Sequence, residues 1–95
     1  MKKKKITITI DDIHRNPWFD GTYRWDTVSI EKISEKILPD DACNAFSNYL
    51  EDFGIENDWI NTEYMGFLTL HCLGTLSDED LVIGINNALK AILKF

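Results

Sequence analysis

The side chains best suited to chemistry are two histidines and two cysteines, His14, His71, Cys43 and Cys72. Their spacing matches no zinc-binding pattern. The neighbours His71 and Cys72 also point in different directions on either a strand or a helix. Both cysteines lie in a part of the chain without Lys or Arg, and that setting opposes thiolate formation. We therefore expect no metal site and no cofactor, and interpret both cysteines as buried thiols.

Paired carboxylates are the other candidate chemistry, at Asp11-Asp12 and Asp40-Asp41. Two acids can serve glycoside hydrolysis or bind a hard metal ion. Each pair, however, falls where we expect a strand to end or a helix to begin, and these positions explain the acids without a catalytic role. The sequence contains no glycine-rich phosphate loop, EF-hand spacing or nucleophile elbow. We predict that the protein is not an enzyme.

The distribution of charge is the strongest signal in the chain. Sixteen acidic and ten basic residues give a formal net charge of −6, and no Lys or Arg lies within residues 37–89. That stretch carries ten acidic residues. Half of them fall at expected helix N-termini, where negative charge stabilises a helix. These five are Asp40, Asp41, Asp78, Glu79 and Asp80.

The other five acids lie within residues 51–63, which we call the acidic segment. Glu51 and Asp52 stand near an expected helix C-terminus, where the helix dipole disfavours them. Trp59 lies among these acids, and Trp is a frequent interface anchor. The predicted partner-binding residues are Glu51, Asp52, Glu56, Asp58, Trp59 and Glu63. The alternative is a solvated loop whose acids serve solubility while Trp59 packs into the core.

A cluster of aromatic residues lies between residues 18 and 25, with arginines interleaved. Stacking rings and arginines can bind single-stranded nucleic acid. The acidic charge of the whole chain disfavours such binding, because phosphate contacts dominate the affinity. In a small domain these rings are expected in the core. The cluster comprises Arg15, Trp18, Phe19, Tyr23, Arg24 and Trp25.

The patterns of apolar and capping residues predict the elements that position these side chains. Residues 4–10 alternate as a strand, Asp20-Gly21 predicts a turn, and residues 22–28 predict a second strand pairing with the first. Helices are expected from Ser29 to Pro39, from Asp40 to Gly54 and from Ser77 onward. Residues 57–73 favour a helix, although their composition also suits a strand.

Together these elements predict an α+β fold in a single domain, residues 1–95. We expect an N-terminal β-strand or hairpin followed by three or four short helices. In the alternative, residues 62–73 form a further strand of an antiparallel sheet. The two isolated cysteines and the lack of an export signal or long apolar run indicate a cytoplasmic protein without a membrane partner.

We accordingly expect a small acidic protein-binding protein of the inhibitor, antitoxin or immunity type. Its partner would be the basic, nucleic-acid-binding surface of a nuclease, a toxin or a nucleic-acid-binding complex. In its short, acidic profile without catalytic motifs, the chain resembles phage-encoded inhibitors of host defence. The alternative is a structural or accessory subunit or a homodimer, with an interface made by residues 18–25 or the last helix.

Overall fold

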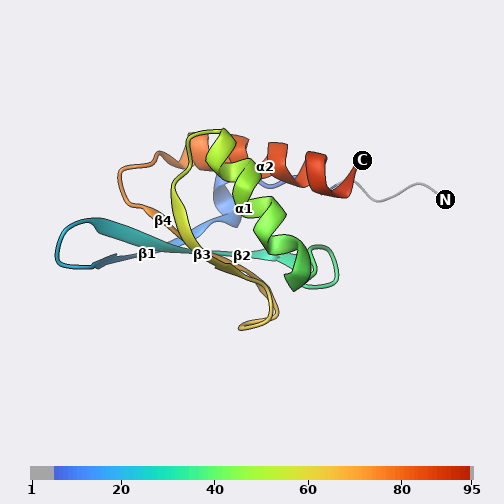
Figure 1. Ribbon diagram of the computed structural model, residues 1–95, viewed down its shortest axis with the longest axis horizontal. Coiled ribbons are helices and arrows are strands. Elements are labelled where there is room, and N and C mark those ends of the chain that lie inside the picture. The colour runs from blue at the N-terminus through green and yellow to red at the C-terminus, as the bar shows by residue number, and fades with distance from the viewer. Residues whose placement is uncertain (1–5, 95) are drawn as a thin grey trace.

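The computed structural model describes residues 6–94. Within that range the chain forms an α+β fold in which two helices cover one face of a four-stranded antiparallel sheet (Figure 1). The strands are β1 (His14–Phe19), β2 (Arg24–Ser34), β3 (Asn57–Asn61) and β4 (Phe67–Leu73). The helices are α1 (Cys43–Asp52) and α2 (Asp78–Leu93), with short 3-10 turns η1 (Ile10–Asp12) and η2 (Asp40–Ala42). No helix in the described range is long and apolar enough to cross a membrane.

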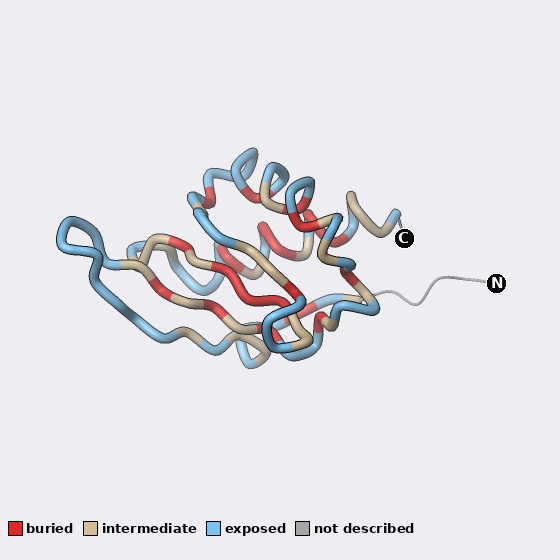
Figure 2. Tube along the Cα trace, turned by 60° about the horizontal axis from the view of Figure 1, so that its bottom comes forward, coloured by how far each residue is buried: buried red, intermediate tan, exposed pale blue. Residues whose placement is uncertain are grey.

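The sheet has the order β1-β2-β4-β3, so β1 and β3 are its edge strands. Alternate residues of a strand point to opposite faces. On the two central strands, one set of side chains is buried in the core together with residues of both helices. This set comprises Val28, Ile30, Leu68, Leu70 and Cys72. The other set lies on a face that no helix covers, which we call the open sheet face; Figure 2 brings it forward.

The predicted turn at Asp20-Gly21 is confirmed, and it joins β1 to β2. Gly21 has a φ of 98°, and the Asp20 carboxylate accepts hydrogen bonds from the backbone N–H groups of Thr22 and Tyr23. Residues within the turn itself therefore explain why the chain reverses direction between β1 and β2.

The strand predicted over residues 4–10 is wrong where the structure describes it, and residues 1–5 lie outside the described range. Residues 6–9 form no regular element. Ile8 is nevertheless buried, and its backbone N–H and C=O bond to the side-chain amide of Asn86 on α2. The alternating isoleucines therefore reflect the burial of Ile8 and not a strand. The strand that pairs with the outer side of β2 is β1.

The helix predicted from Ser29 to Pro39 is also wrong, because β2 runs on to Ser34. A register irregularity lies between Ile30 and Ser34. It allows Ile30 and Ile33 to be buried together, although they are three residues apart. A bulge in a strand thus reproduced the apolar spacing of a helix.

Helix α1 confirms the prediction for residues 40–54. Its C-terminus is a Schellman cap, in which Gly54 has a φ of 80° and the Ile55 N–H bonds to the Leu50 carbonyl. Of the aromatic residues at helical spacing in this segment, Phe46 is buried, whereas Tyr49 and Phe53 are exposed. Cys43 and Leu50 complete the buried face instead.

The helix favoured over residues 57–73 is wrong, since β3 and β4 occupy this stretch. The alternative, a strand within residues 62–73, holds for Phe67–Leu73. Gly66, with a φ of 79°, precedes β4. The final helix is confirmed as α2, with the Ser77 hydroxyl accepting a hydrogen bond from the Asp80 N–H at 3.1 Å.

Candidate protein-binding site

The acidic segment extends from the end of α1, along edge strand β3, into the turn that follows. Glu51 and Asp52 end α1, and Glu56 lies in the connection to β3. Asp58 and Trp59 belong to β3 itself. All five acidic side chains and Trp59 are exposed; the sixth position, Glu63, follows β3. The structure therefore places every predicted binding residue on the molecular surface.

The segment is fixed to the fold at several points, so it is not a loose solvated loop. Ile55 is buried in the core. The Asn57 amide donates to the Ile55 carbonyl at 3.1 Å, and its Oδ1 accepts a bond from the Ser47 hydroxyl on α1. The Asn61 amide donates to Asp40 Oδ1 at 2.9 Å. These bonds hold β3 beside α1, so the backbone that carries the acidic side chains has a fixed position.

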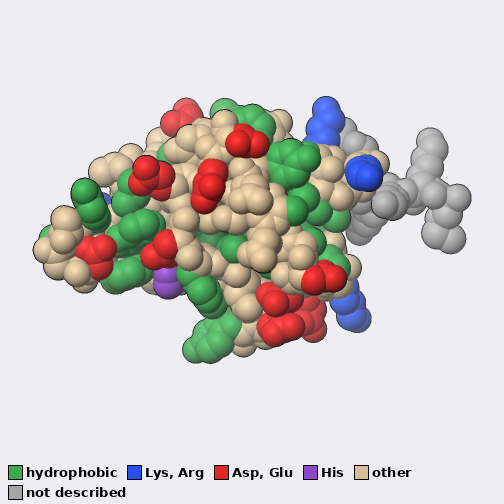
Figure 3. All heavy atoms as spheres, in the orientation of Figure 1, with side chains coloured by type: hydrophobic (Ala, Val, Ile, Leu, Met, Phe, Trp, Pro, Cys, Tyr) green, Lys and Arg blue, Asp and Glu red, His purple; other side chains and the backbone are tan. Residues whose placement is uncertain are grey.

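Lys and Arg do not neutralise this segment. Within the described residues, no Lys or Arg nitrogen lies within 4.0 Å of any of its carboxylates. Asp58 instead approaches His71, with 3.3 Å between Asp58 Oδ1 and His71 Nδ1. Figure 3 shows acidic side chains spread over the face that carries α1 and β3, whereas Lys and Arg appear chiefly at the end beside the chain termini.

Trp59 does not pack into the core. It is 37% exposed and lies on the open sheet face, opposite His71 in the register of β3 and β4. The ring centroids of Trp59 and His71 are 5.0 Å apart. The interpretation of Trp59 as a core residue is therefore wrong.

The open sheet face holds an aromatic row that sequence reasoning missed. Its members are Trp18 of β1, Trp25 of β2, His71 of β4 and Trp59 of β3. Trp18 stacks on Trp25 with centroids 6.2 Å apart, and contacts the His71 ring edge-on at 5.1 Å. A signal existed in the alternation of Trp25, Thr27 and Ser29 with buried neighbours.

The expected core role of the aromatic cluster at residues 18–25 is wrong. Phe19 and Tyr23 are exposed by 68% and 60%, Trp18 by 36%, and Trp25 is half-buried. His71 also lies on the open sheet face, with its side chain 27% exposed. These rings therefore form surface, and the core is built mainly from aliphatic side chains.

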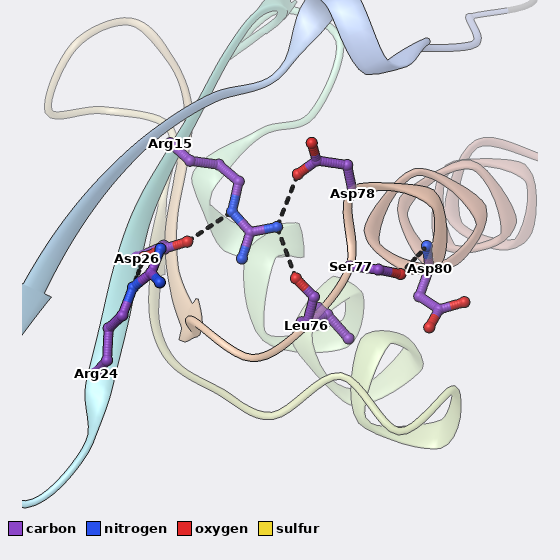
Figure 4. A network of polar contacts seen from close by, with 7 residues as sticks. All are labelled: Arg15, Arg24, Asp26, Leu76, Ser77, Asp78 and Asp80. Atoms are coloured by element: carbon purple, nitrogen blue, oxygen red, sulfur yellow. Dashed lines mark hydrogen bonds and ion pairs between the residues drawn. The ribbon is translucent and has the colours of Figure 1, made fainter.

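The two arginines near these rings in sequence both bind a buried carboxylate, as Figure 4 shows. Asp26, 1% exposed, accepts from Arg15 Nε at 2.7 Å and from Arg24 Nε at 3.3 Å. Arg15 Nη1 also donates to the Leu76 carbonyl and to Asp78, both at 2.8 Å. Arg15 thus joins β1 and β2 to the start of α2, and it is not positioned to hold a phosphate beside Trp18.

Both cysteines are buried, as expected. Burial raises the pKa of the Cys72 thiol to about 11 and also raises the pKa of Cys43. A thiol with a raised pKa is a poor nucleophile near neutral pH, because the thiolate is the reactive form.

A hollow next to the start of α2 is lined by two leucines together with small and acidic residues. It contains no His, Cys, Lys or Arg among its lining residues, which are Gly54, Glu56, Leu73, Thr75, Leu76, Ser77 and Asp80. Within the described residues, no three His, Cys, Asp or Glu side chains converge as metal ligands. The hollow therefore offers no recognisable catalytic set.

No protein-family model matches the chain, and no match was found among curated proteins or solved structures.

Proposed function

We propose that the protein binds another protein and occupies a basic, nucleic-acid-binding surface on it, as inhibitors, antitoxins and immunity proteins do. One observation carries the proposal. Residues 51–63, at the end of α1 and along edge strand β3, carry five exposed carboxylates and the exposed Trp59, and no Lys or Arg of the described residues pairs with these carboxylates.

The physical reason is electrostatic. Unpaired carboxylates create a negative potential that attracts Lys and Arg on a partner and speeds encounter. On a nucleic-acid-binding surface these carboxylates would take the place of phosphates. Trp59 can contribute buried apolar area at the centre of such an interface. Because exposed charges are screened by salt, the association should weaken as ionic strength rises.

The test begins with capture of partners from the native host at low and high salt, followed by binding measurements with the purified partner. The informative variant neutralises four acids of the segment: Glu51→Gln, Asp52→Asn, Glu56→Gln and Asp58→Asn. A matched control removes the same charge elsewhere on the exposed surface: Asp11→Asn, Glu31→Gln, Glu35→Gln and Glu79→Gln.

We expect the first variant to lose most of its affinity and the control to retain it. Excess duplex DNA should compete with the wild-type protein for the partner, because both would occupy the same basic surface. Equal affinity of the wild-type protein and the first variant would refute the proposal.

A homodimer is a second candidate, favoured by a separate observation. The open sheet face and the β1–β2 hairpin expose several rings, among them Trp18, Phe19 and Tyr23. Exposed aromatic surface of this kind often marks an interface. Light scattering discriminates between the two: a monomeric mass supports the acidic binding protein, and a dimeric mass that Trp18→Ala abolishes supports the homodimer.

A further inference from the structure

The open sheet face combines aromatic rings with a carboxylate at the place where β3 meets β4. We propose that this face binds an arginine side chain of the basic partner, with the guanidinium stacked on Trp59 and paired with Asp58. The inference rests on the proposed function and specifies which side chain of the partner is recognised and where.

The geometry brings the two groups together on one edge strand. Trp59 pairs with His71 across the β3–β4 register, and the register shifts between Asn57 and Trp59. At this irregularity the Asp58 carboxylate lies 3.3 Å from the His71 ring while remaining 51% exposed. Its second oxygen, Oδ2, has no partner among the described residues. A carboxylate oxygen and an exposed ring therefore lie side by side on the surface.

The charge on this face favours a cationic ligand. The strand positions that the printed pairing places on this face carry no Lys or Arg; they are His14, Asn16, Trp18, Trp25, Thr27, Ser29, Thr69, His71, Leu73, Trp59 and Asn61. The nearby Arg15 and Arg24 are committed to Asp26. A nucleic acid stacked on these rings would find no Lys or Arg for its phosphates at these described strand positions and would meet Asp58 instead.

Arginine fits the site better than lysine does. Its planar guanidinium can stack on an indole ring and donate two parallel hydrogen bonds to a carboxylate at the same time. A lysine ammonium would gain the charge attraction but not the stacking or the paired donors.

A second copy of this chain fits the face less well. It would bring another Asp58 and another molecule of net charge −6 against the same surface. Like charges directly opposed across an interface are unfavourable. The aromatic row therefore fits a partner of opposite charge.

The test compares two peptides of equal charge, hexaarginine and hexalysine, titrated calorimetrically into the protein at low salt. We expect hexaarginine to bind about threefold to fivefold more tightly than hexalysine, about the net gain of one additional hydrogen bond from the planar guanidinium to the carboxylate. Trp59→Ala and Asp58→Asn should each reduce this preference toward one. Trp59→Phe, which keeps a ring, should retain part of it and guards against misfolding of the alanine variant.

Asp52→Asn is the matched control. It removes an exposed charge of the same segment, but this charge lies at the end of α1, whereas Asp58 lies on β3. We expect it to weaken both peptides equally and to leave the arginine preference intact.

The outcomes separate this inference from the proposed function. If both peptides bind equally and Trp59→Ala changes nothing, the arginine site is refuted, while general binding of basic partners stands. If neither peptide binds and no basic partner is captured, the proposed function fails as well. Binding of a thymidine decamer that Trp59→Ala abolishes would make the face a nucleic-acid platform and overturn the inference. A dimer that Trp59→Ala dissociates would overturn it too.

Discussion

At the scale of single residues, Asp26 presents the sharpest electrostatic problem in the fold. Its carboxylate lies on β2 among core side chains and is 1% exposed. A buried charge is costly unless it is paired and hydrogen-bonded. Arg15 and Arg24 supply that pairing, and Arg15 also binds the Leu76 carbonyl and Asp78. The cluster therefore fixes the hairpin against the N-terminal end of α2.

We expect Arg15→Ala to destabilise the protein by about 3–5 kcal/mol, because it removes the closer partner of the buried Asp26 charge and leaves only the 3.3 Å contact with the exposed Arg24. Urea denaturation measures the loss. The control is Lys32→Ala, which removes an exposed contact with Asp12 at 3.8 Å and should cost about 1 kcal/mol or less. Equal losses in the two variants would contradict this account of Asp26.

The raised pKa of Cys72 predicts how stability depends on pH. The thiol ionises near 9.0 in its unperturbed state and at about 11 in the fold, because burial disfavours the thiolate. Above pH 9 the unfolded chain loses this proton first, so the unfolded state gains stability relative to the folded state. We therefore expect the free energy of unfolding to fall between pH 9 and pH 11.

Cys72→Val isolates that contribution, because this thiol is the one titratable group in which the two proteins differ. Urea midpoints at pH 7, 9 and 10.5 should decline less steeply in the variant than in the wild type. Parallel declines would show that the Cys72 thiol has no raised pKa in the fold.

At the scale of elements, the parts that sequence could predict are those with local causes. The turn at Asp20-Gly21, the Schellman cap at Gly54 and the Ser77 cap each depend on residues within a few positions of one another. Helices α1 and α2 were therefore predictable, with bounds within a few residues. The same holds for the acidic segment, which is visible in the distribution of charge alone.

The sheet was harder to predict because its signals are either ambiguous or distant in sequence. The bulge between Ile30 and Ser34 mimics a helical apolar period. The aromatic row requires the register of all four strands, which brings Trp18 to His71 and His71 to Trp59. No local pattern specifies which strand pairs with which. The composition of residues 57–73 suited a strand, but the strands form because β4 pairs with both β2 and β3, which are distant in sequence or separated from it by a turn.

The packing of α2 against the end of α1 depends on Gly84. A Cβ atom at this position would lie 2.1 Å from Ile55 Cδ1, and Ile55 is fully enclosed by the core. Replacing a helical Gly with Ala usually stabilises by up to about 1 kcal/mol. Here we expect Gly84→Ala to destabilise by about 1–3 kcal/mol, because overpacking outweighs that gain.

Ile55→Val provides the decisive background for Gly84→Ala, since it removes the Cδ1 methyl group that would clash. In that background Gly84→Ala should be neutral or stabilising, and a double-mutant cycle in urea measures the difference. Additive effects of the two substitutions would mean that Ile55 is not what excludes a side chain at Gly84.

At the scale of the whole molecule, exposed acidic charge and exposed aromatic surface meet at one edge of the sheet. The acidic segment lies along one edge of the sheet, and the aromatic row crosses the open sheet face to meet it at Asp58 and Trp59. Glu51 and Asp52 stand at the C-terminal end of α1, where the helix dipole disfavours negative charge. By contrast, Glu79 and Asp80 stand in the first turn of α2, where it favours them.

This contrast predicts opposite effects of the same chemical change at the two helix ends. Glu51→Gln with Asp52→Asn should raise the free energy of unfolding at low salt, by about 0.3–1 kcal/mol per residue. Glu79→Gln with Asp80→Asn should lower it by a similar amount. Thermal unfolding at low and high ionic strength measures both pairs, and added salt should shrink both effects. A stabilising change at residues 51 and 52 that also weakens partner binding would show that their charge serves recognition at the expense of stability. A destabilising change there would mean that the fold itself uses these two acids, and the acidic segment would lose its main claim to a binding role.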